Sequence, residues 1–249
     1  MKKYLKYIFA LASLAAAGGL SAEVIPLASP DGRLKAEIST GDCFTLSATL
    51  DGKQMLKSAK ISLKTPRRTI CSGLPYSLDK RFHESPSAAE SFNQLEFSYT
   101  DAGYKVYVRA YNNALAYCVE LKSHPATEII LDERLEIEAD YAIVFPAQEL
   151  PAVFTGSAQL GRVALIETDD PDYPKIKIKT SNRGRLLTAD FKKIKNTSEF
   201  EPEYIYRLDG RAKVLPWRAF TPVAGYADEN IGIVKARLQS ADLTGKKKL

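Results

Sequence analysis

The sequence predicts an all-β fold, a β-sandwich built as one domain. Tyr and Phe occur 13 and 10 times while Met occurs twice, and aromatic side chains favour strands over helices. From Arg33 onward, apolar and polar residues alternate with a period of two, in short runs separated by Gly, Asn and Pro turns. That pattern is typical of antiparallel sandwiches. A chain of 249 residues can bury a sizeable core, and all-β domains of about 200–250 residues often form one unit.

The first expected strands form hairpins. Residues 34–38 and 44–50 each place apolar side chains on one face and polar ones on the other. Asp51-Gly52 follows directly, and this dipeptide is a strong hairpin-turn signal. Residues 54–56 then begin the return strand.

The middle of the chain repeats the pattern with strands at 95–99, 104–108 and 115–121. The turns between them are residues 101–103 and 112–113, which are rich in Asp, Gly and Asn. Outside the N-terminus no stretch of a dozen residues has a clear amphipathic helical stripe. Residues 84–94 are a short helix or a loop, and residues 192–204 an exposed connector. Later strands are expected at 128–131, 135–137, 163–166, 175–179, 205–208, 211–215 and 231–238.

Residues 1–22 are predicted to be a secretory signal peptide. Lys2, Lys3 and Lys6 precede a short apolar run at residues 8–17, and small residues follow up to Ala22. The alternative is an uncleaved anchor, but the apolar run is shorter than the roughly 20 residues of a membrane span. We therefore expect a bacterial protein exported to the periplasm or the outer cell surface. Its domain spans residues 23–245 and is followed by a basic tail at 246–249.

The net charge of +5 comes from the two ends of the chain. Six of the 35 Lys and Arg residues lie before residue 23 or after residue 245, whereas all 30 Asp and Glu lie between. The predicted domain therefore carries a net charge of −1. A nucleic-acid partner normally needs a basic face on the folded domain, so none is expected.

Several classes of catalytic and metal site are excluded by composition. The chain has two histidines, His83 and His124, and three widely spaced cysteines, Cys43, Cys71 and Cys118, with no CxxC pair. A zinc site is therefore not expected. Each cysteine sits in a strand-like context, where a buried thiol acts as a small hydrophobe, although an exported protein could join two of them. GxSxG, Walker and GxGxxG motifs are absent.

A dense acidic loop follows the expected strand at 163–166. Glu167, Asp169, Asp170 and Asp172 lie within six residues, just before Tyr173 and Pro174. Carboxylates this close repel one another unless a cation or solvent compensates, and hard oxygen ligands suit Ca²⁺. The plain alternative is a solvated acidic loop.

The only tryptophan, Trp217, stands next to Arg218. Such a pair can form a corner that stacks on a sugar or binds a carboxylate, and Tyr111 is a further aromatic candidate. The alternative for Trp217 and Tyr111 is burial in the core, with Arg218 at the surface.

Taken together, five stretches resemble the N-terminal domain of glycoside hydrolase family 97. Their order and rough spacing match across nearly the whole predicted mature chain. They are residues 29–34, 46–53, 108–117, 166–169 with 173–174, and 216–218.

The resemblance implies a β-supersandwich of the galactose-mutarotase type. It also implies a relation to exported bacterial α-glucosidases and α-galactosidases that degrade polysaccharides. Their catalytic carboxylates lie on a (β/α)₈ barrel, on which the N-terminal domain packs. The domain lends a Glu to an active-site Ca²⁺, and by its position Glu167 corresponds to that ligand. Calcium is therefore expected as a cofactor only where a barrel is present.

Some positions depart from the family pattern. Asn113, Ala114 and Cys118 replace the usual Asp, Gly and Arg, and Lys175 replaces a Gly. The chain also stops about where the family's barrel would begin. These departures suggest relaxed constraint on a site.

No catalytic residue is nominated, because hydrolysis needs two placed carboxylates flanking the glycosidic bond. The first hypothesis is an exported, non-catalytic domain that binds an α-glucoside or α-galactoside through Trp217, Arg218 and Tyr111, or serves as an accessory piece. The alternative is part of a split or truncated calcium-dependent α-glycosidase, with Glu167 supplied to a barrel on another chain. A truncated gene product without function is the third hypothesis.

Overall fold

The computed structural model describes ten segments of the chain. They are residues 23–65, 69–70, 75–83, 90–122, 129–139, 150–174, 176–191, 206–207, 212–225 and 227–240. The predicted signal peptide, the basic tail, Cys71 and His124 lie outside the described residues. So do most of the loop at 84–94 and the whole connector at 192–204.

The described elements are mostly strands. The first nine are β1 (Val24–Ala28), β2 (Leu34–Ser39), β3 (Phe44–Leu50), β4 (Lys53–Lys64), β5 (Thr69–Ile70), β6 (Ser77–His83), β7 (Phe92–Tyr99), β8 (Tyr104–Tyr111) and β9 (Leu115–Leu121). The others are β10 (Ile129–Ile130), β11 (Asp132–Glu138), β12 (Ala152–Ser157), β13 (Gly161–Glu167), β14 (Ile176–Ser181), η1 (Asn182–Gly184), β15 (Leu186–Phe191), β16 (Tyr206–Arg207), β17 (Lys213–Val214), β18 (Arg218–Val223) and the helix α1 (Glu229–Ser240).

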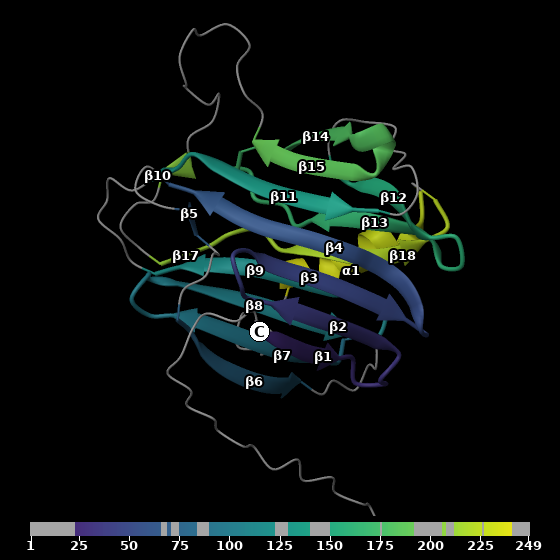
Figure 1. The fold of residues 1–249 in the computed structure, drawn as a ribbon, viewed down its shortest axis with the longest axis horizontal. Coiled ribbons are helices and arrows are strands. Elements are labelled where there is room, and N and C mark those ends of the chain that lie inside the picture. The colour runs from purple at the N-terminus through teal and green to yellow at the C-terminus, as the bar shows by residue number, and fades with distance from the viewer. Residues whose placement is uncertain are drawn as a thin grey trace, which may run out of the picture.

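Two antiparallel sheets face each other, which confirms the predicted all-β sandwich (Figure 1). Sheet A has the order β1-β2-β3-β4-β11-β15-β14, with β5 on β4. Sheet B has the order β12-β13-β18-β9-β8-β7-β6, with β17 on β9. A small third pairing joins β10 to β16. Sequential hairpins dominate, and β11 and β18 are the strands that cross to distant neighbours.

The main core lies between the two sheets. β3 shows why the sequence folds this way, because its odd-even alternation buries every second side chain against sheet B and leaves the others at the surface. Phe44 of β3 meets Phe97 of β7 edge to face, with ring centroids 5.1 Å apart. Other members of this core include Leu34, Ile38, Leu46, Tyr104, Val106, Leu135, Ile137, Leu165 and Phe220.

The predicted hairpins of the first half are confirmed. Asp51 and Gly52 both have positive φ, at 52° and 74°, as a tight turn between β3 and β4 requires. Gly103 has a φ of 71° in the turn between β7 and β8. The ranges expected at 44–50 and 115–121 agree with β3 and β9.

A second, smaller core lies on the outer face of sheet B, where α1 covers it. Val234 and Leu238 of α1 are buried there with Ile166 and Ala219 of sheet B. The strand expected at 231–238 is therefore wrong. Positions 231, 234 and 238 repeat with a helical spacing, and this narrow stripe is easily taken for alternation. Asp228 caps the helix, since its Oδ1 accepts a hydrogen bond from the backbone N–H of Asn230 at 2.9 Å.

Within the segments that the structure describes, no helix is long and apolar enough to cross a membrane.

Candidate functional site

An ionic cluster joins the two sheets at one end of the sandwich. Arg218, at the start of β18, is almost fully buried, and its Nη2 lies 2.7 Å from Glu133 Oε2 and 2.7 Å from Glu167 Oε2. Glu133 comes from β11 of sheet A, while Glu167 ends β13 and pairs with Arg218 across sheet B. The Tyr173 hydroxyl donates a hydrogen bond of 2.6 Å to Glu133 Oε2. We call these four residues the inter-sheet cluster.

One guanidinium balances two carboxylates in this cluster. Desolvation raises the pKa of Glu167, and the nearby Arg218 opposes part of that rise. Burial alone would lower the pKa of Arg218, but Glu133 and Glu167 outweigh it, so the guanidinium stays charged. Burial, followed by the charge of Glu133, raises the pKa of Tyr173 well above its usual value. The cluster therefore holds a neutral phenol, a fixed cation and a carboxylate that is costly to keep ionised.

Glu167 is the most accessible of the three charged members, with 23% of its side chain exposed against 6% for Glu133 and 1% for Arg218. Its Oε2 lies close to Arg218 but makes no hydrogen bond of good geometry. Glu167 is thus the charged member of the cluster that could contact a ligand or a partner domain.

The acidic loop does not gather its carboxylates around one point. Asp169 pairs with Lys235 of α1 at 2.7 Å, and Asp170 accepts a hydrogen bond from the backbone N–H of Asp172 at 3.0 Å. In the part of the chain that the structure describes, no three His, Cys, Asp or Glu side chains come together as a metal site. Ca²⁺ usually takes six to eight oxygens, so these residues do not form a calcium site by themselves. The calcium role of Glu167 stays a prediction.

On the opposite face of sheet B, a second charged group is enclosed by aromatic rings. The Arg109 guanidinium lies between the ring of Phe92, at 4.3 Å, and the ring of Trp217, at 4.4 Å. Its Nε donates a hydrogen bond of 2.6 Å to Gln94 Oε1. Tyr111 packs against Phe92 with ring centroids 5.1 Å apart. We call these five residues the outer-face cluster.

The helix α1 closes this cluster from outside. Arg237 of α1 lies over the ring of Tyr111 at 5.0 Å and donates a hydrogen bond of 3.1 Å to Asn113 Oδ1. Asn113 is one of the positions at which the sequence departs from the family pattern. Here its amide helps to dock the helix.

The expected Trp-Arg corner is not formed. Because β18 alternates, Trp217 enters the outer-face cluster and Arg218 enters the inter-sheet cluster, on opposite faces of one sheet. Trp217, Arg218 and Tyr111 are all buried in this chain. The core alternative therefore describes Trp217 and Tyr111, and Arg218 is interior as well. Sugar contact by these three residues stays a prediction.

Sequence reasoning missed Arg109 and Glu133. Arg109 carried a usable signal, since a lone Arg inside the run Val106 to Tyr111 must find partners when the strand is buried. Glu133 carried none, because it lies 85 residues from Arg218 in the sequence and sits in an ordinary charged segment.

Cys118 is buried on the outer face of sheet B. It is a free thiol, and burial raises its pKa. Cys43 is a free thiol at the surface. Cys118 thus acts as a small apolar side chain, as one of the two sequence alternatives proposed.

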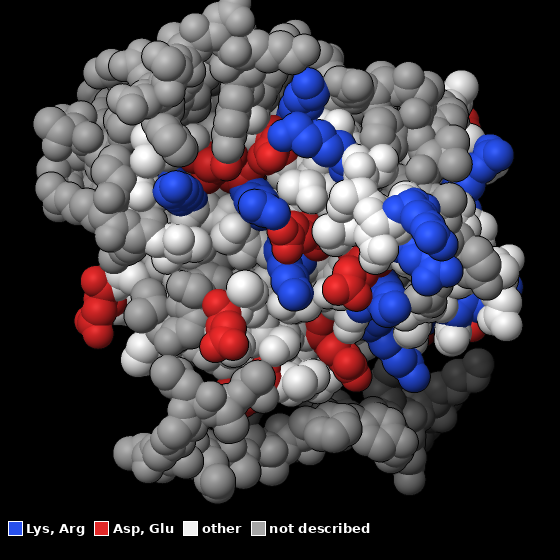
Figure 2. All heavy atoms as spheres, turned by 45° about the horizontal axis from the view of Figure 1, so that its top comes forward, with Lys and Arg blue, Asp and Glu red and all other residues white. Residues whose placement is uncertain are grey.

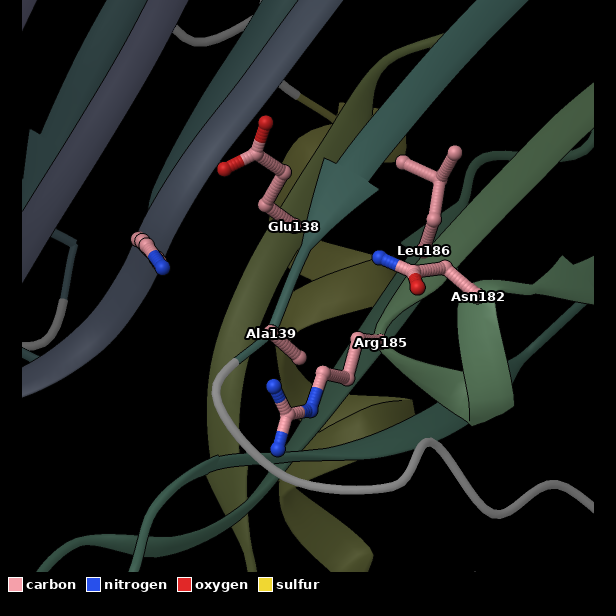
Figure 3. A pocket seen from close by; sticks show the side chains of 6 residues that line it. Glu138, Ala139, Asn182, Arg185 and Leu186 are labelled. Carbon is pink, nitrogen blue, oxygen red and sulfur yellow. The ribbon is translucent and has the colours of Figure 1, made fainter.

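Two hollows lie on the described part of the surface. One, of about 280 Å³, lies where β11 ends beside the β14–β15 turn, and Figure 3 shows Arg185 and Asn182 reaching toward Ala139 there. Its lining residues are Lys57, Glu138, Ala139, Asn182, Arg185 and Leu186. The other, of about 300 Å³, lies along β1 and β6. Neither is lined by a site residue that the sequence predicted.

Charged side chains of both signs intermingle on the face shown in Figure 2. Arg134 pairs with Glu136 on β11, and Lys179 pairs with Asp190 across β14 and β15 at 3.1 Å. This part of the surface is therefore a solvated, mixed-charge sheet face.

A family model and several solved structures match this chain. The family model described as "Glycosyl-hydrolase 97 N-terminal" matches residues 27–146. A glycoside hydrolase family 97 enzyme from Pseudoalteromonas sp. strain K8, solved in complex with acarbose, superposes with a TM-score of 0.60 at 16% identity. The match covers 79% of this chain and 35% of that one. The panose complex of an enzyme of this family from the same strain gives the same values.

A β-arabinopyranosidase is also similar, with a TM-score of 0.55 and 16% identity over 79% of this chain and 40% of that one. The chain thus spans only about a third of the length of the enzymes from strain K8. No match was found among curated proteins. At this identity the solved structures establish the shared fold.

Proposed function

We propose that the chain, which matches the model of the glycoside hydrolase family 97 N-terminal domain over residues 27–146, is an exported, non-catalytic accessory domain of a family 97-type glycoside hydrolase. The observation that carries this proposal is the match of that family model. The structure adds that the buried carboxylates of Glu133 and Glu167 are already paired with Arg218. A glycosidase needs two carboxylates facing a sugar across an open site. Glu133 and Glu167 instead share one Nη2 of Arg218 inside the domain.

A more specific version of this proposal is that the accessory domain binds carbohydrate. Two solved family 97 enzymes with this fold are in complex with acarbose and with panose. In this chain the aromatic side chains expected to stack on a sugar are buried. A sugar would therefore bind only with movement of α1, and the binding would be weak.

The alternative role rests on the exposure of Glu167. The Glu167 side chain at the end of β13 is 23% exposed, so its carboxylate can be offered to a Ca²⁺ whose other ligands lie on a barrel, while its buried Oε2 stays beside Arg218. That barrel would lie on another chain or in a longer form of this protein. Arg218 would hold the Glu167 side chain in place, and no other described residue would be needed.

The first experiment tests catalysis and sugar binding on the purified chain. Hydrolysis of p-nitrophenyl α-glucoside and α-galactoside is measured with and without Ca²⁺, and thermal unfolding is measured with panose and acarbose. We expect no turnover. Turnover that survives purification and disappears in Glu133→Gln would overturn the non-catalytic role. A rise in melting temperature with panose that Trp217→Phe reduces would support sugar binding.

A second experiment tests the role of Glu167. A family 97 barrel domain is titrated with wild-type chain and with Glu167→Gln, in the presence and absence of Ca²⁺. The calcium-dependent part of the affinity is expected to vanish in the variant. Asp172→Asn, which changes an exposed carboxylate of the same loop, is the matched control and retains it. An equal calcium response in all three chains would refute the assignment.

Export is tested separately by the mass of the protein secreted from a bacterial host. Cleavage after Ala22 predicts a chain that begins at Glu23. A cytoplasmic protein that keeps Met1 would contradict it.

A further inference from the structure

The strand β6 is an exposed edge with no strand on its outer side among the described residues. It is the last strand of sheet B and pairs only with β7. Six of its seven residues are exposed, and Figure 1 shows it at the lower margin of the molecule. Exposed edge strands present unpaired backbone groups that can pair with another chain.

Sheet A does not extend far enough to cover β6. Its own edge strand, β1, lies over β7, where Asn93 Nδ2 donates a hydrogen bond of 2.7 Å to the carbonyl oxygen of Ala28. The hollow of about 300 Å³ lies at this edge of sheet A, between β1 on one side and β6 and β7 on the other. Among the described residues, no strand of sheet A therefore covers the inner side of β6, where a sandwich normally has a second layer.

Two rows of side chains on β6 have different chemistry. The row toward sheet A holds Leu78, Lys80 and Phe82, and Leu78 and Phe82 are 37% and 58% exposed. The opposite row holds Ser77, Asp79, Arg81 and His83. Within one copy, Arg81 Nη2 lies 3.2 Å from Asp79 Oδ2. Large apolar side chains on an edge strand are unusual unless they are covered by a partner.

We propose that β6 pairs with β6 of a second copy of this chain, antiparallel and centred on Lys80. In that register Asp79 of each copy lies opposite Arg81 of the other, so two ion pairs form. Leu78 of each copy lies opposite Phe82 of the other, so two apolar pairs form. The strand is thus complementary to itself in both rows, as a two-fold interface requires.

Other in-plane registers lose this match. Shifting the centre by one residue places Asp79 opposite itself or Arg81 opposite itself, and like charges directly opposite are unfavourable. The proposed register has one unfavourable pair, Lys80 with its own copy. That pair weakens the dimer and keeps it reversible.

The dimer is also expected to be weak because its interface is small. One seven-residue strand edge buries less than the roughly 800 Å² per partner of a standard stable interface. Dissociation is therefore expected within the concentration range of sedimentation equilibrium. This proposal is independent of the accessory function, since it uses none of the cluster residues.

The test is sedimentation equilibrium of the full chain over a range of concentrations. Wild type is expected to show a monomer–dimer equilibrium. Asp79→Lys and Phe82→Ser are expected to weaken it at least tenfold, whereas Lys80→Thr strengthens it by removing the like-charge pair. Asp101→Lys, in the exposed β7–β8 turn, and Ile233→Ser, on the exposed face of α1, are the matched controls and leave it unchanged.

A charge-swap experiment tests the proposed register of the two β6 strands. Asp79→Lys and Arg81→Glu chains each repel their own copies, but a mixture of the two restores both ion pairs and forms a heterodimer. Because Arg81 also contacts Glu96 at 3.1 Å, folding of Arg81→Glu is checked by circular dichroism. If that variant fails to fold, the Asp79→Lys, Phe82→Ser and Lys80→Thr series decides. A chain that is monomeric at every concentration, or a dimer that none of these changes alters, would overturn the proposal.

Discussion

Sheets A and B differ in how many of their faces are covered, and this difference explains where the chain can bury charge. Sheet A packs one face on the core and turns the other to water, so strands such as β2, β3 and β11 alternate. The middle of sheet B is covered on both faces. Only Lys105 is not buried in β8, and only Glu120 in β9. Strands buried on both faces lose the alternating pattern.

The two largest fully buried side chains, Arg109 and Arg218, both lie in sheet B and on opposite faces of it. Each is compensated differently. Arg218 is matched by carboxylates, and Arg109 by aromatic rings and an amide. The ion pairs formed within sheet A lie at the surface, for example Arg134 with Glu136, whereas its buried Glu133 pairs with Arg218 of sheet B. Charged groups buried in the core or under α1 thus depend on specific partners, while those on the open face of sheet A do not.

The largest expected effect is at Arg218. Arg218→Met leaves Glu133 and Glu167 buried without their cation, and breaking a buried pair costs about 3–5 kcal/mol of unfolding free energy. Urea unfolding followed by far-UV circular dichroism measures this loss. Arg33→Met, which breaks an exposed pair with Asp51, is the control and is expected to change little. Equal losses in the two variants would remove the contrast between the sheets.

Trp217 tests the outer-face cluster. Trp217→Ala removes a buried ring and one of the two ring faces over Arg109, and such truncations cost about 3–5 kcal/mol. Val24→Ala, at an exposed apolar position of β1, should stay within about 0.5 kcal/mol. The same urea titration compares them. A Trp217→Ala chain as stable as Val24→Ala would show that α1 does not cover this face in solution.

The helix itself supplies the third test. Leu238→Ala empties a buried site between α1 and sheet B and is expected to cost about 2–5 kcal/mol. Ile233→Ala, on the exposed side of the same helix, is expected to cost within about 0.5 kcal/mol. Thermal unfolding of both variants checks the difference. A reversed order would favour the strand that the sequence suggested at 231–238.

The smallest effect is a pH dependence at Glu167. Burial raises the pKa of this carboxyl above its ordinary value of 4.5, so the folded protein binds the proton more tightly than the unfolded chain. Its contribution to stability is therefore greatest below pH 4.5 and declines as the pH rises through the raised pKa. The stability of Glu167→Gln relative to wild type should rise over the same window, as measured by urea unfolding at a series of pH values.

Asp228 is the control of opposite sign. Backbone hydrogen bonds from Ala224 and Asn230 lower its pKa, so its stabilising contribution is present above the ordinary value of 3.8 and is lost as the pH falls. Asp228→Asn should therefore flatten the acid side of the curve. Parallel behaviour of Glu167→Gln and Asp228→Asn would contradict the assigned environment of Glu167.

The strand predictions succeeded in both sheets, for example at residues 44–50 of sheet A and residues 115–121 of sheet B. Alternation in residues 44–50 and the Asp51-Gly52 turn are local signals, and the structure confirms both. The helix α1 was missed because only three of its apolar residues, Ile231, Val234 and Leu238, face sheet B. The surface that they contact is formed by strands far away in the sequence. The binding role of Trp217, Arg218 and Tyr111 stays a prediction, and the arrangement of their side chains did not follow from the sequence. Trp217 and Arg218 are neighbours in sequence, yet they belong to different cores.

By itself the sequence determined the all-β class, most of the hairpins and the residues that resemble a known family, because each depends on contacts between near neighbours. Only the tertiary structure decided which face each polar side chain occupies. It brought Glu133 to Arg218 from the opposite sheet, enclosed Arg109 between two rings and left β6 uncovered. Long-range pairing sets those environments, since a side chain's burial and its electrostatic partners come from strands far away in the sequence.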